Sequence, residues 1–294
     1  MLDSRLQSFL SSPLAIDRRY LLGLCASIAR GTAVRADDDP QRQAPAPAAV
    51  GATAVIPIVG VIAHRSDWMM EWFGGVSTQD IDRWVRKAMA DPAIGSIVFD
   101  VDSPGGSVEG LEETSDLIYG FRGRKPMVAV ANKAMFSAAY YIGSAADRVL
   151  VAPSAMVGSI GTLAVHTDIS RMLDEAGIKE TLIYRGRYKA EGAASEPLAD
   201  EARAEFQRII DSYYVEFVDA VARNRNVPRE TVEADFGQGR TFRAADAVAV
   251  GMADAVGTLE DAAATAVSMA GQSGGRDPAI MRRRALHRLP SLPK

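Results

Sequence analysis

The hydrophobic positions in the middle of the chain follow two alternating patterns. Short apolar runs rich in β-branched residues predict buried strands, and apolar residues spaced three and four apart predict amphipathic helices. One helix begins near Ser77, because a serine followed three residues later by Asp80 is typical of a helix N-terminus. The expected strands are 53–60, 94–101, 127–131, 148–151, 161–165 and 181–184, and the other expected helices are 110–121, 138–146, 168–176 and 198–225. Strands that alternate with helices favour an α/β fold with a mainly parallel sheet.

The longest helical pattern, 198–225, has one broad apolar face. Such a face suits either the core of a domain or an interface between subunits, and the pattern leaves both open. Its apolar residues are Phe206, Ile209, Ile210, Tyr213, Phe217, Val218 and Val221.

Four regions differ in composition. Residues 1–33 include an amphipathic pattern around Arg18–Arg30 and are interpreted as an N-terminal helical extension. Residues 34–52 are rich in Pro and Ala without periodicity, which predicts a linker. The dense apolar patterning of 53–270 predicts a single globular domain. Residues 271–294 are rich in Gly, Pro and Arg and predict a flexible basic tail.

Composition limits the classes of function. The chain has 294 residues and a formal net charge of −4, so no overall charge favours nucleic-acid binding. A single cysteine, Cys25, excludes an intrachain disulfide and fits a reducing compartment. No apolar run reaches the roughly 18 residues of a spanning helix, and the stretch 20–29 lacks the cleavage context of a signal peptide. No metal-binding motif is present. We expect an intracellular protein with no membrane span, no metal and no cofactor.

Two glycines, Gly105 and Gly106, stand in the segment 102–108 between a predicted strand and a predicted helix. Glycines allow unusual backbone angles and a close approach of the backbone to a ligand. Amides at such a position can stabilise an anion. A phosphate-binding loop is disfavoured because no Lys-Ser/Thr pair follows the glycines. A tight turn with no further role remains an open interpretation of this segment alone.

Ser137 falls where the predicted strand 127–131 gives way to the small-residue helix 138–146. This position would expose a hydroxyl and present the next amide, that of Ala138, as an oxyanion donor. The flanking Met135 and Ala139 differ from the Gly-x-Ser-x-Gly elbow. Taken alone, Ser137 is better explained as a helix cap than as a nucleophile.

A serine nucleophile needs a base, and both histidine and lysine are candidates. The histidines are His64, His166 and His287, and the lysines are Lys87, Lys125, Lys133, Lys179, Lys189 and Lys294. None of the histidines stands in a recognisable motif, although a triad with His64 or His166 stays open. Lys189 lies in a loop between a predicted strand and the long helix, flanked by small residues. A lysine serves as a base only where burial or nearby positive charge lowers its pKa, so Lys189 taken alone is better explained as a solvated lysine.

Five segments taken together resemble the signal peptide peptidase A family of serine peptidases, family S49. They most resemble its phage branch of capsid-assembly proteases. The resemblance covers about residues 53–265. The segments are Ser-Pro-Gly-Gly-Ser at 103–107, Phe-Ser-Ala-Ala-Tyr-Tyr at 136–141, Ala-x₅-Gly-Ser-Ile-Gly-Thr at 152–162, Gly-x-Tyr-Lys-Ala at 186–190 and Ala-x₃-Gly-Met-Ala-Asp-x₂-Gly at 247–257.

The resemblance implies roles for eight residues and a ClpP/crotonase-like fold built from repeated β-β-α units. It also implies acyl-enzyme chemistry in a ring-like homo-oligomer. The implied roles are nucleophile for Ser137, general base for Lys189, orientation of the lysine for Ser159, oxyanion-hole amides for Gly106 and Ala138, and the substrate groove for Gly105, Gly158 and Gly161.

The phage branch implies polypeptide substrates, namely scaffold, portal and capsid proteins cleaved during head maturation. The site of action would be the bacterial host cytoplasm or the phage prohead. The lack of a membrane anchor in the sequence argues against a membrane role in signal-peptide degradation. Three alternatives remain: a cellular peptide-degrading protease, a crotonase-like acyl-CoA enzyme with a similar oxyanion hole, and a non-catalytic assembly protein.

Overall fold

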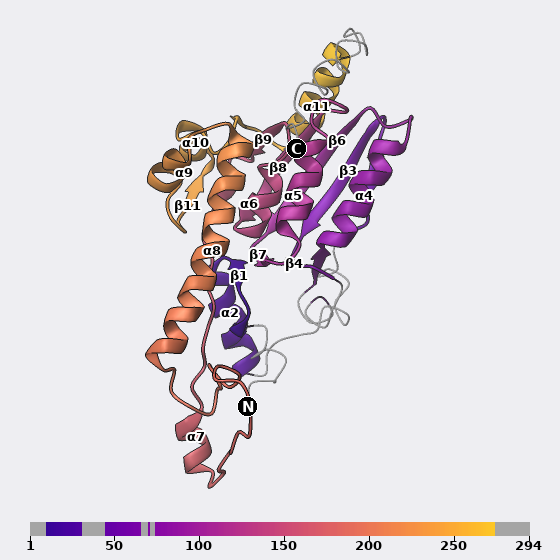
Figure 1. Ribbon diagram of the computed structural model, residues 1–294. Coiled ribbons are helices and arrows are strands. Elements are labelled where there is room, and N and C mark those ends of the chain that lie inside the picture. Colours follow the sequence, from indigo (N-terminus) through magenta and orange to yellow (C-terminus); the bar gives the residue numbers. More distant parts are fainter. Residues whose placement is uncertain (1–9, 31–44, 66–69, 71–73, 274–294) are drawn as a thin grey trace, which may run out of the picture.

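The computed structural model describes residues 10–30, 45–65, 70 and 74–273 (Figure 1). Its larger sheet has eight strands, and the central ones, β3, β6, β8, β9 and β10, run parallel, whereas β2 and β11 pair antiparallel with their neighbours. This confirms the predicted α/β class with a mainly parallel sheet. The strands are β2 (Ala48–Val50), β3 (Thr53–Val59), β6 (Ser96–Ser103), β8 (Met127–Phe136), β9 (Arg148–Val151), β10 (Met156–Gly158), β11 (Thr241–Arg243) and β12 (Ala255–Val256).

Helices cover both faces of this sheet (Figure 1). The alternation of side chains along β6 and β8 explains how. Phe99 and Ala129 belong to the main core with α4, α5 and α6, whereas Val98 and Val128 pack against α11. The helices of the described chain are α2 (Arg18–Ala29), α4 (Thr78–Ala90), α5 (Leu111–Gly120), α6 (Ala138–Gly143), α7 (Ser170–Glu175), α8 (Asp200–Arg225), α9 (Arg229–Asp235), α10 (Ala244–Ala249) and α11 (Leu259–Ser273).

A second, four-stranded sheet has the order β1-β7-β4-β5. It consists of β1 (Leu14–Ile16), β7 (Gly105–Ser107), β4 (Val61–Ala63) and β5 (Gly75–Ser77). The predicted N-terminal helix is present as α2, but the residues before it form an edge strand of this sheet. Leu14, Ile16 and Leu21 pack with Val61 and Ala63 in a small apolar cluster of their own. The N-terminal region is therefore joined to the domain by backbone pairing.

Three expectations about secondary structure are wrong. Residues 181–184 form no strand, because they lie in an exposed segment where Ile183 is 96% accessible. Residues 161–165 form only a single bridge, between Leu163 and Leu14. The end of the predicted linker, Ala48–Val50, pairs antiparallel with β3 through a turn at Gly51. The rest of that linker as far as residue 44, residues 1–9 and residues 274–294 of the predicted tail lie outside the described residues.

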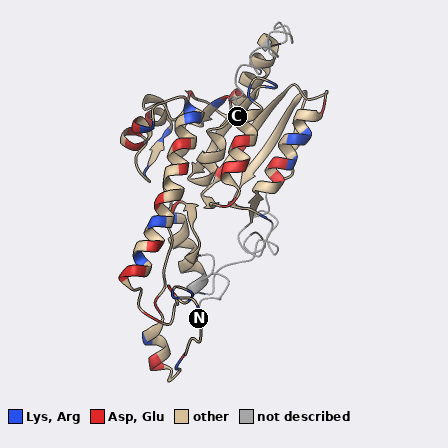
Figure 2. Ribbon diagram, in the orientation of Figure 1, with Lys and Arg blue, Asp and Glu red and all other residues tan. Residues whose placement is uncertain are grey.

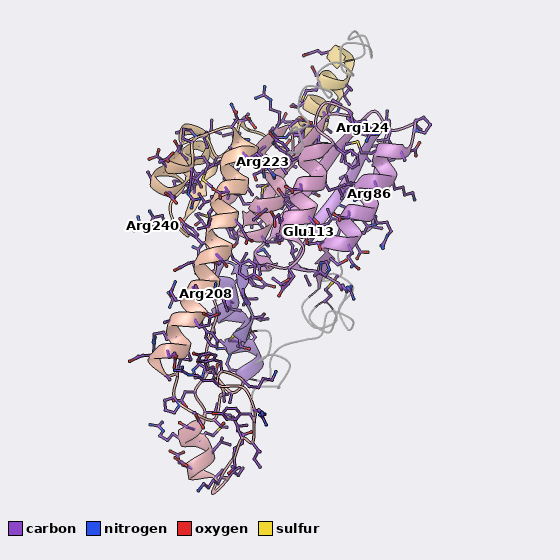
Figure 3. All side chains as sticks on the ribbon, in the orientation of Figure 1. Arg86, Glu113, Arg124, Arg208, Arg223 and Arg240 are labelled. Carbon is purple, nitrogen blue, oxygen red and sulfur yellow. The ribbon has the colours of Figure 1, made fainter. Side chains whose placement is uncertain are left out.

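Helix α8 has two halves with different surroundings. Its C-terminal half packs on the core through Phe217, Val218 and Val221 and includes Arg223, which is labelled beside α5 in Figure 3. Its N-terminal half, marked there by Arg208, projects away from the sheet together with the segment that holds α7 (Figures 1 and 3). Charges of both signs line this helix in Figure 2. Of the helices in the described ranges, none is both long and apolar enough to span a membrane.

Candidate active site

Ser137 occupies a strained elbow between β8 and α6. Its backbone angles are φ 53° and ψ −117°, outside the regions that L-residues normally adopt. Two backbone hydrogen bonds hold it there: Ser137 N–H donates to the Gly158 carbonyl at 2.7 Å, and Tyr141 N–H donates to the Ser137 carbonyl at 2.9 Å. Strain of this kind costs about 1–3 kcal/mol and is typical of functional sites. Ser137 is therefore more than a helix cap, and indeed its side chain makes no capping bond.

Of the two glycines of β7, Gly105 lies against this elbow and Gly106 lies against Ile62 of β4. A Cβ added to Gly105 would stand 3.0 Å from the Ser137 Cβ and 2.2 Å from the Ala15 carbonyl oxygen. A Cβ added to Gly106 would stand 1.7 Å from the Ile62 carbonyl oxygen. Both positions therefore require glycine. The structure brings together the two segments in which the sequence predicted an oxyanion site and a nucleophile.

The segment 158–161 forms the other side of the site. The Ser137 hydroxyl donates to the Gly161 carbonyl at 3.3 Å. Ser159 has a positive φ of 59°, and its N–H donates to the Arg240 carbonyl at 2.7 Å. A cavity of about 580 Å³ opens beside this segment and is lined by Ser159, Gly161, residues 16–19 and residues 238–241. The predicted residues Gly105, Gly158, Ser159 and Gly161 thus lie around or next to Ser137.

Lys189 is not part of this cluster. It is exposed, and its backbone N–H donates to the Gly186 carbonyl at 3.1 Å within a loop between α7 and α8. That loop lies in the extension at the bottom of Figure 1, away from β7 and α6. Ser137, in contrast, is completely buried. In the described part of this single chain, the structure places the predicted nucleophile and the predicted base apart.

The described histidines do not replace the lysine. His64 Nδ1 lies 3.1 Å from the Thr78 hydroxyl oxygen, and His166 Nε2 lies 3.4 Å from the Ala193 carbonyl oxygen. The hydroxyl of Ser137 is instead directed at a backbone carbonyl. His287 lies outside the described residues. The geometry gives no support to a histidine-based triad with His64 or His166.

Two residues that sequence reasoning missed hold α6 in place. The buried Tyr140 hydroxyl donates to the Met252 carbonyl at 2.8 Å, which explains part of the motif at 247–257. Arg122 donates to the carbonyls of Ser144, Ala145 and Ala146 at 2.6–3.0 Å, beyond the C-terminus of α6. Burial lowers the pKa of Arg122, but a guanidinium stays charged at any working pH. Both contacts fix the helix that begins directly after Ser137.

The same motif contains an ion-pair hub, Asp254. Its carboxylate accepts bonds from Arg225 at 3.0 Å, from the Val149 N–H at 2.7 Å and from Arg148 at 3.2 Å. Burial acts to raise the pKa of Asp254, but the hydrogen bond and charge of Arg225 outweigh it, so the pKa is lowered. Asp254 therefore joins the end of α8 to β9. No local pattern in the sequence predicts that Asp254 contacts Arg225, Val149 and Arg148.

We expect Asp254→Ala to lower the free energy of unfolding by about 3 kcal/mol at neutral pH, because it leaves the buried Arg225 guanidinium without its counterion. A carboxyl whose folded-state pKa is lowered stabilises the fold above its unfolded pKa, and this contribution is lost as pH falls through the folded-state value. Urea unfolding of both proteins should therefore give curves that converge towards acid pH. The exposed Asp235→Ala is the control. A difference from wild type that does not change with pH would contradict this assignment.

A comparison with models of protein families shows to which family the chain belongs. The family model of peptidase family S49 matches residues 121–273, which is about half of the chain and includes Ser137, Ser159 and Lys189. The chain belongs to peptidase family S49. The resemblance identified from the five motif segments is thereby confirmed.

Two phage proteins and one solved structure are similar to this S49 chain. Head-tail preconnector protein GP5 of Enterobacteria phage P21 is 32% identical over 213 residues, covering 72% of this chain and 42% of that protein. Capsid assembly protease C of Escherichia phage lambda is 30% identical over 230 residues, covering 78% and 52%. The chain thus spans about half the length of the curated relatives it matches. Among solved structures, a ClpP1 mutant from Listeria monocytogenes aligns with a TM-score of 0.41 at 15% identity, covering 71% of this chain and 93% of that one.

Proposed function

We propose that this S49 chain is a serine endopeptidase in which Ser137 attacks the substrate carbonyl. The observation that carries the proposal is the strained elbow at Ser137 beside two glycines that admit no side chain. Attack by the Ser137 Oγ on a peptide carbonyl gives an acyl-enzyme and frees the amine half of the substrate. Water then hydrolyses the ester. No metal or cofactor enters this mechanism.

The amides of Gly106 and Ala138 are proposed as the oxyanion hole. Ala138 begins α6, so its N–H is one of those that have no partner within the helix. Gly106 lies in β7, next to the glycine that contacts Ser137. Two fixed N–H donors stabilise the negative charge that develops on the carbonyl oxygen, and each is typically worth about 2.7–4 kcal/mol in the transition state. The glycines Gly105, Gly158 and Gly161 would let an extended peptide approach.

Lys189 is proposed as the general base, supplied by a neighbouring copy of the chain. A base has to reach within about 2.6–3.2 Å of the hydroxyl whose proton it takes, and Lys189 is exposed on an extension that leaves the domain. The extension also carries partly exposed apolar residues of α8, such as Phe206 and Ile210. In a ring of identical chains each extension would cover the site of the next chain. This arrangement fits the homo-oligomer implied by the family.

Ser159 is proposed to orient the lysine once it arrives, because its side chain borders the cavity next to Ser137. We expect Ser159→Ala to lower kcat less than loss of Lys189 does, and to move the ascending limb of the pH–rate profile to lower pH. Loss of a positioning hydrogen bond weakens the neutral amine as an acceptor of the serine proton. Initial rates from pH 6 to 10 measure this. A variant with an unchanged profile and a raised KM alone would assign Ser159 to substrate binding.

The client is proposed to be a phage or prophage structural protein, cut during capsid maturation in the bacterial host cytoplasm or the prohead. This rests on the names of the two phage relatives, one a capsid assembly protease and the other a head-tail preconnector protein. Scaffold, portal and capsid proteins are the expected substrates, and nucleic acid is not expected as a partner. A cellular peptide-degrading protease is the second candidate of the same chemistry.

Incubation with reduced, unfolded β-casein tests the reaction class. The proposal expects internal fragments with new N-termini, identified by mass spectrometry, and no hydrolysis of an acyl-CoA thioester. Hydrolysis of the thioester with intact casein would favour a crotonase-like enzyme. Neither reaction, from an oligomeric and folded protein, would favour a non-catalytic assembly role.

A further inference from the structure

The N-terminal strand β1 lies in the position that an extended substrate would take at this site. On one side it pairs antiparallel with β7, the strand of Gly105 and Gly106. On the other side Leu14 and Leu163 exchange two backbone hydrogen bonds of 2.8 and 2.9 Å. Leu163 follows directly on the segment 158–162 that borders Ser137. A peptide held in this way between a strand and a bridging residue gains backbone bonds on both edges, as in β-strand addition.

The register of β1 brings one particular peptide bond to the site. Ala15 stands opposite Gly106, and Ile16 opposite Gly105. Asp17 N–H donates to the Pro104 carbonyl at 2.8 Å. Hydrogen-bonded and non-hydrogen-bonded pairs alternate along an antiparallel ladder. Since Asp17 and Pro104 form a hydrogen-bonded pair, the pair two residues earlier, Ala15 and Gly106, is of the hydrogen-bonded kind as well. The backbone N–H and C=O of Ala15 therefore face Gly106. The carbonyl that meets the proposed oxyanion glycine is therefore that of Ala15.

Distances around Gly105 agree with this register. The Ala15 carbonyl oxygen and the Ser137 Cβ both lie within 3.0 Å of the point where a Cβ on Gly105 would stand. Ala15 and Ser137 are each completely buried. A cavity of about 420 Å³ borders Ala15, and the cavity of about 580 Å³ borders Ile16 and the residues after it. The two cavities therefore leave open space on both sides of β1, as expected of a groove that holds an extended chain.

We propose that the Ala15–Ile16 bond is a substrate of Ser137, so that the enzyme cuts its own N-terminal segment and thereby opens the groove. This rests on the proposed function of Ser137. The Ser137 Oγ bonds to the Ala15 carbonyl carbon while its proton passes to the base. The Ala15–Ile16 C–N bond then breaks, and the amine of Ile16 leaves with that proton. Water hydrolyses the ester, which releases a peptide ending in Ala15 and restores Ser137.

The packing of the flanking residues is compatible with such a cut. Ile16 stays attached to α2, whose Leu21 packs in the same cluster, whereas Leu10 and Leu14 would be held by that cluster without a covalent link. The competing interpretation is a permanent strand that fills the groove and is never cut. The two interpretations differ in the N-terminus of the mature protein.

The test is the intact mass of the purified chain over time, compared with Ser137→Ala. We expect the wild type to lose residues 1–15 and gain an N-terminal Ile16, and the variant to keep them. A synthetic peptide of residues 11–20 should be cut after its alanine by the wild type alone, and a scrambled peptide of the same composition should stay intact. Hydrolysis of casein by an enzyme whose N-terminus remains whole, or is cut elsewhere, would overturn the inference. Failure on casein, peptide and N-terminus together would instead reject the proposed peptidase activity.

Discussion

Replacing Ser137 with alanine is expected to lower the rate of casein hydrolysis by at least about 10³-fold, because the nucleophile is lost and only binding and the oxyanion hole remain. Alanine keeps a Cβ at φ 53°, so the strained elbow and its packing stay as they are. The melting temperature should therefore change little. Fragment release measured under conditions of excess substrate checks the rate, and a thermal melt checks the fold.

The matched control is Ser154→Ala, which removes a hydroxyl from an exposed turn and should keep full activity. Ser137→Gly adds a second control, since glycine tolerates the positive φ and should raise stability by about 1 kcal/mol while remaining inactive. Retention of more than a tenth of the activity in Ser137→Ala would mean that another residue is the nucleophile.

Replacing Lys189 with alanine is expected to cost about 10²–10⁴-fold in kcat, the usual contribution of a general base. An equal mixture of Ser137→Ala and Lys189→Ala chains, each inactive alone, should then recover activity after joint refolding. If each site takes its serine from one chain and its lysine from the next, about a quarter of the sites in a random ring are intact. Peptide hydrolysis before and after mixing measures the recovery.

Lys179→Ala, an exposed lysine of the same extension, is the control for an effect of charge alone and should stay active. Recovery near zero, with mixed oligomers demonstrated by mass spectrometry, would place both residues of the pair in one chain. The extension would then have to fold back onto its own domain. Full activity in Lys189→Ala would remove the lysine from the mechanism.

The proximity of Ser137 and Gly105 could be predicted from the sequence because both follow neighbouring parallel strands. Their segments come after the apolar runs that became β6 and β8, and the carboxyl ends of parallel strands meet at one edge of a sheet. Each segment also carries a local signal, a pair of glycines in one and a change from strand to small-residue helix in the other. Local signals at the ends of adjacent strands suffice to locate a site.

Other parts of the fold depend on contacts that no local pattern records. Strand β1 has three residues, too few for a period, and its place is set by backbone pairing with β7 and Leu163. Residues 181–184 have the composition of a strand but no neighbouring strand to pair with in the described chain. The bond between Asp254 and Arg225 joins distant helical and strand ends. Such features follow from the assembled fold and not from propensity.

The different surroundings of the two halves of α8 also could not be predicted from the local sequence pattern. The periodic apolar face predicted from Phe206 to Val221 is continuous in sequence, yet only its second half is buried in the core. Periodicity identifies the face of a helix and does not say what covers it. The proposed ring would cover the first half with a neighbouring subunit, which would bring Lys189 with it.

Labelling with a fluorophosphonate probe asks whether Ser137 itself forms the covalent bond on which the proposed chemistry depends. The probe reacts with an activated serine hydroxyl in a way that marks the residue for peptide mass spectrometry. We expect one adduct, on Ser137, that is absent in Ser137→Ala and strongly reduced in Lys189→Ala. An enzyme that hydrolyses casein but carries the label on another residue, or labels equally after Ser137→Ala, would contradict the assignment of Ser137 as the nucleophile.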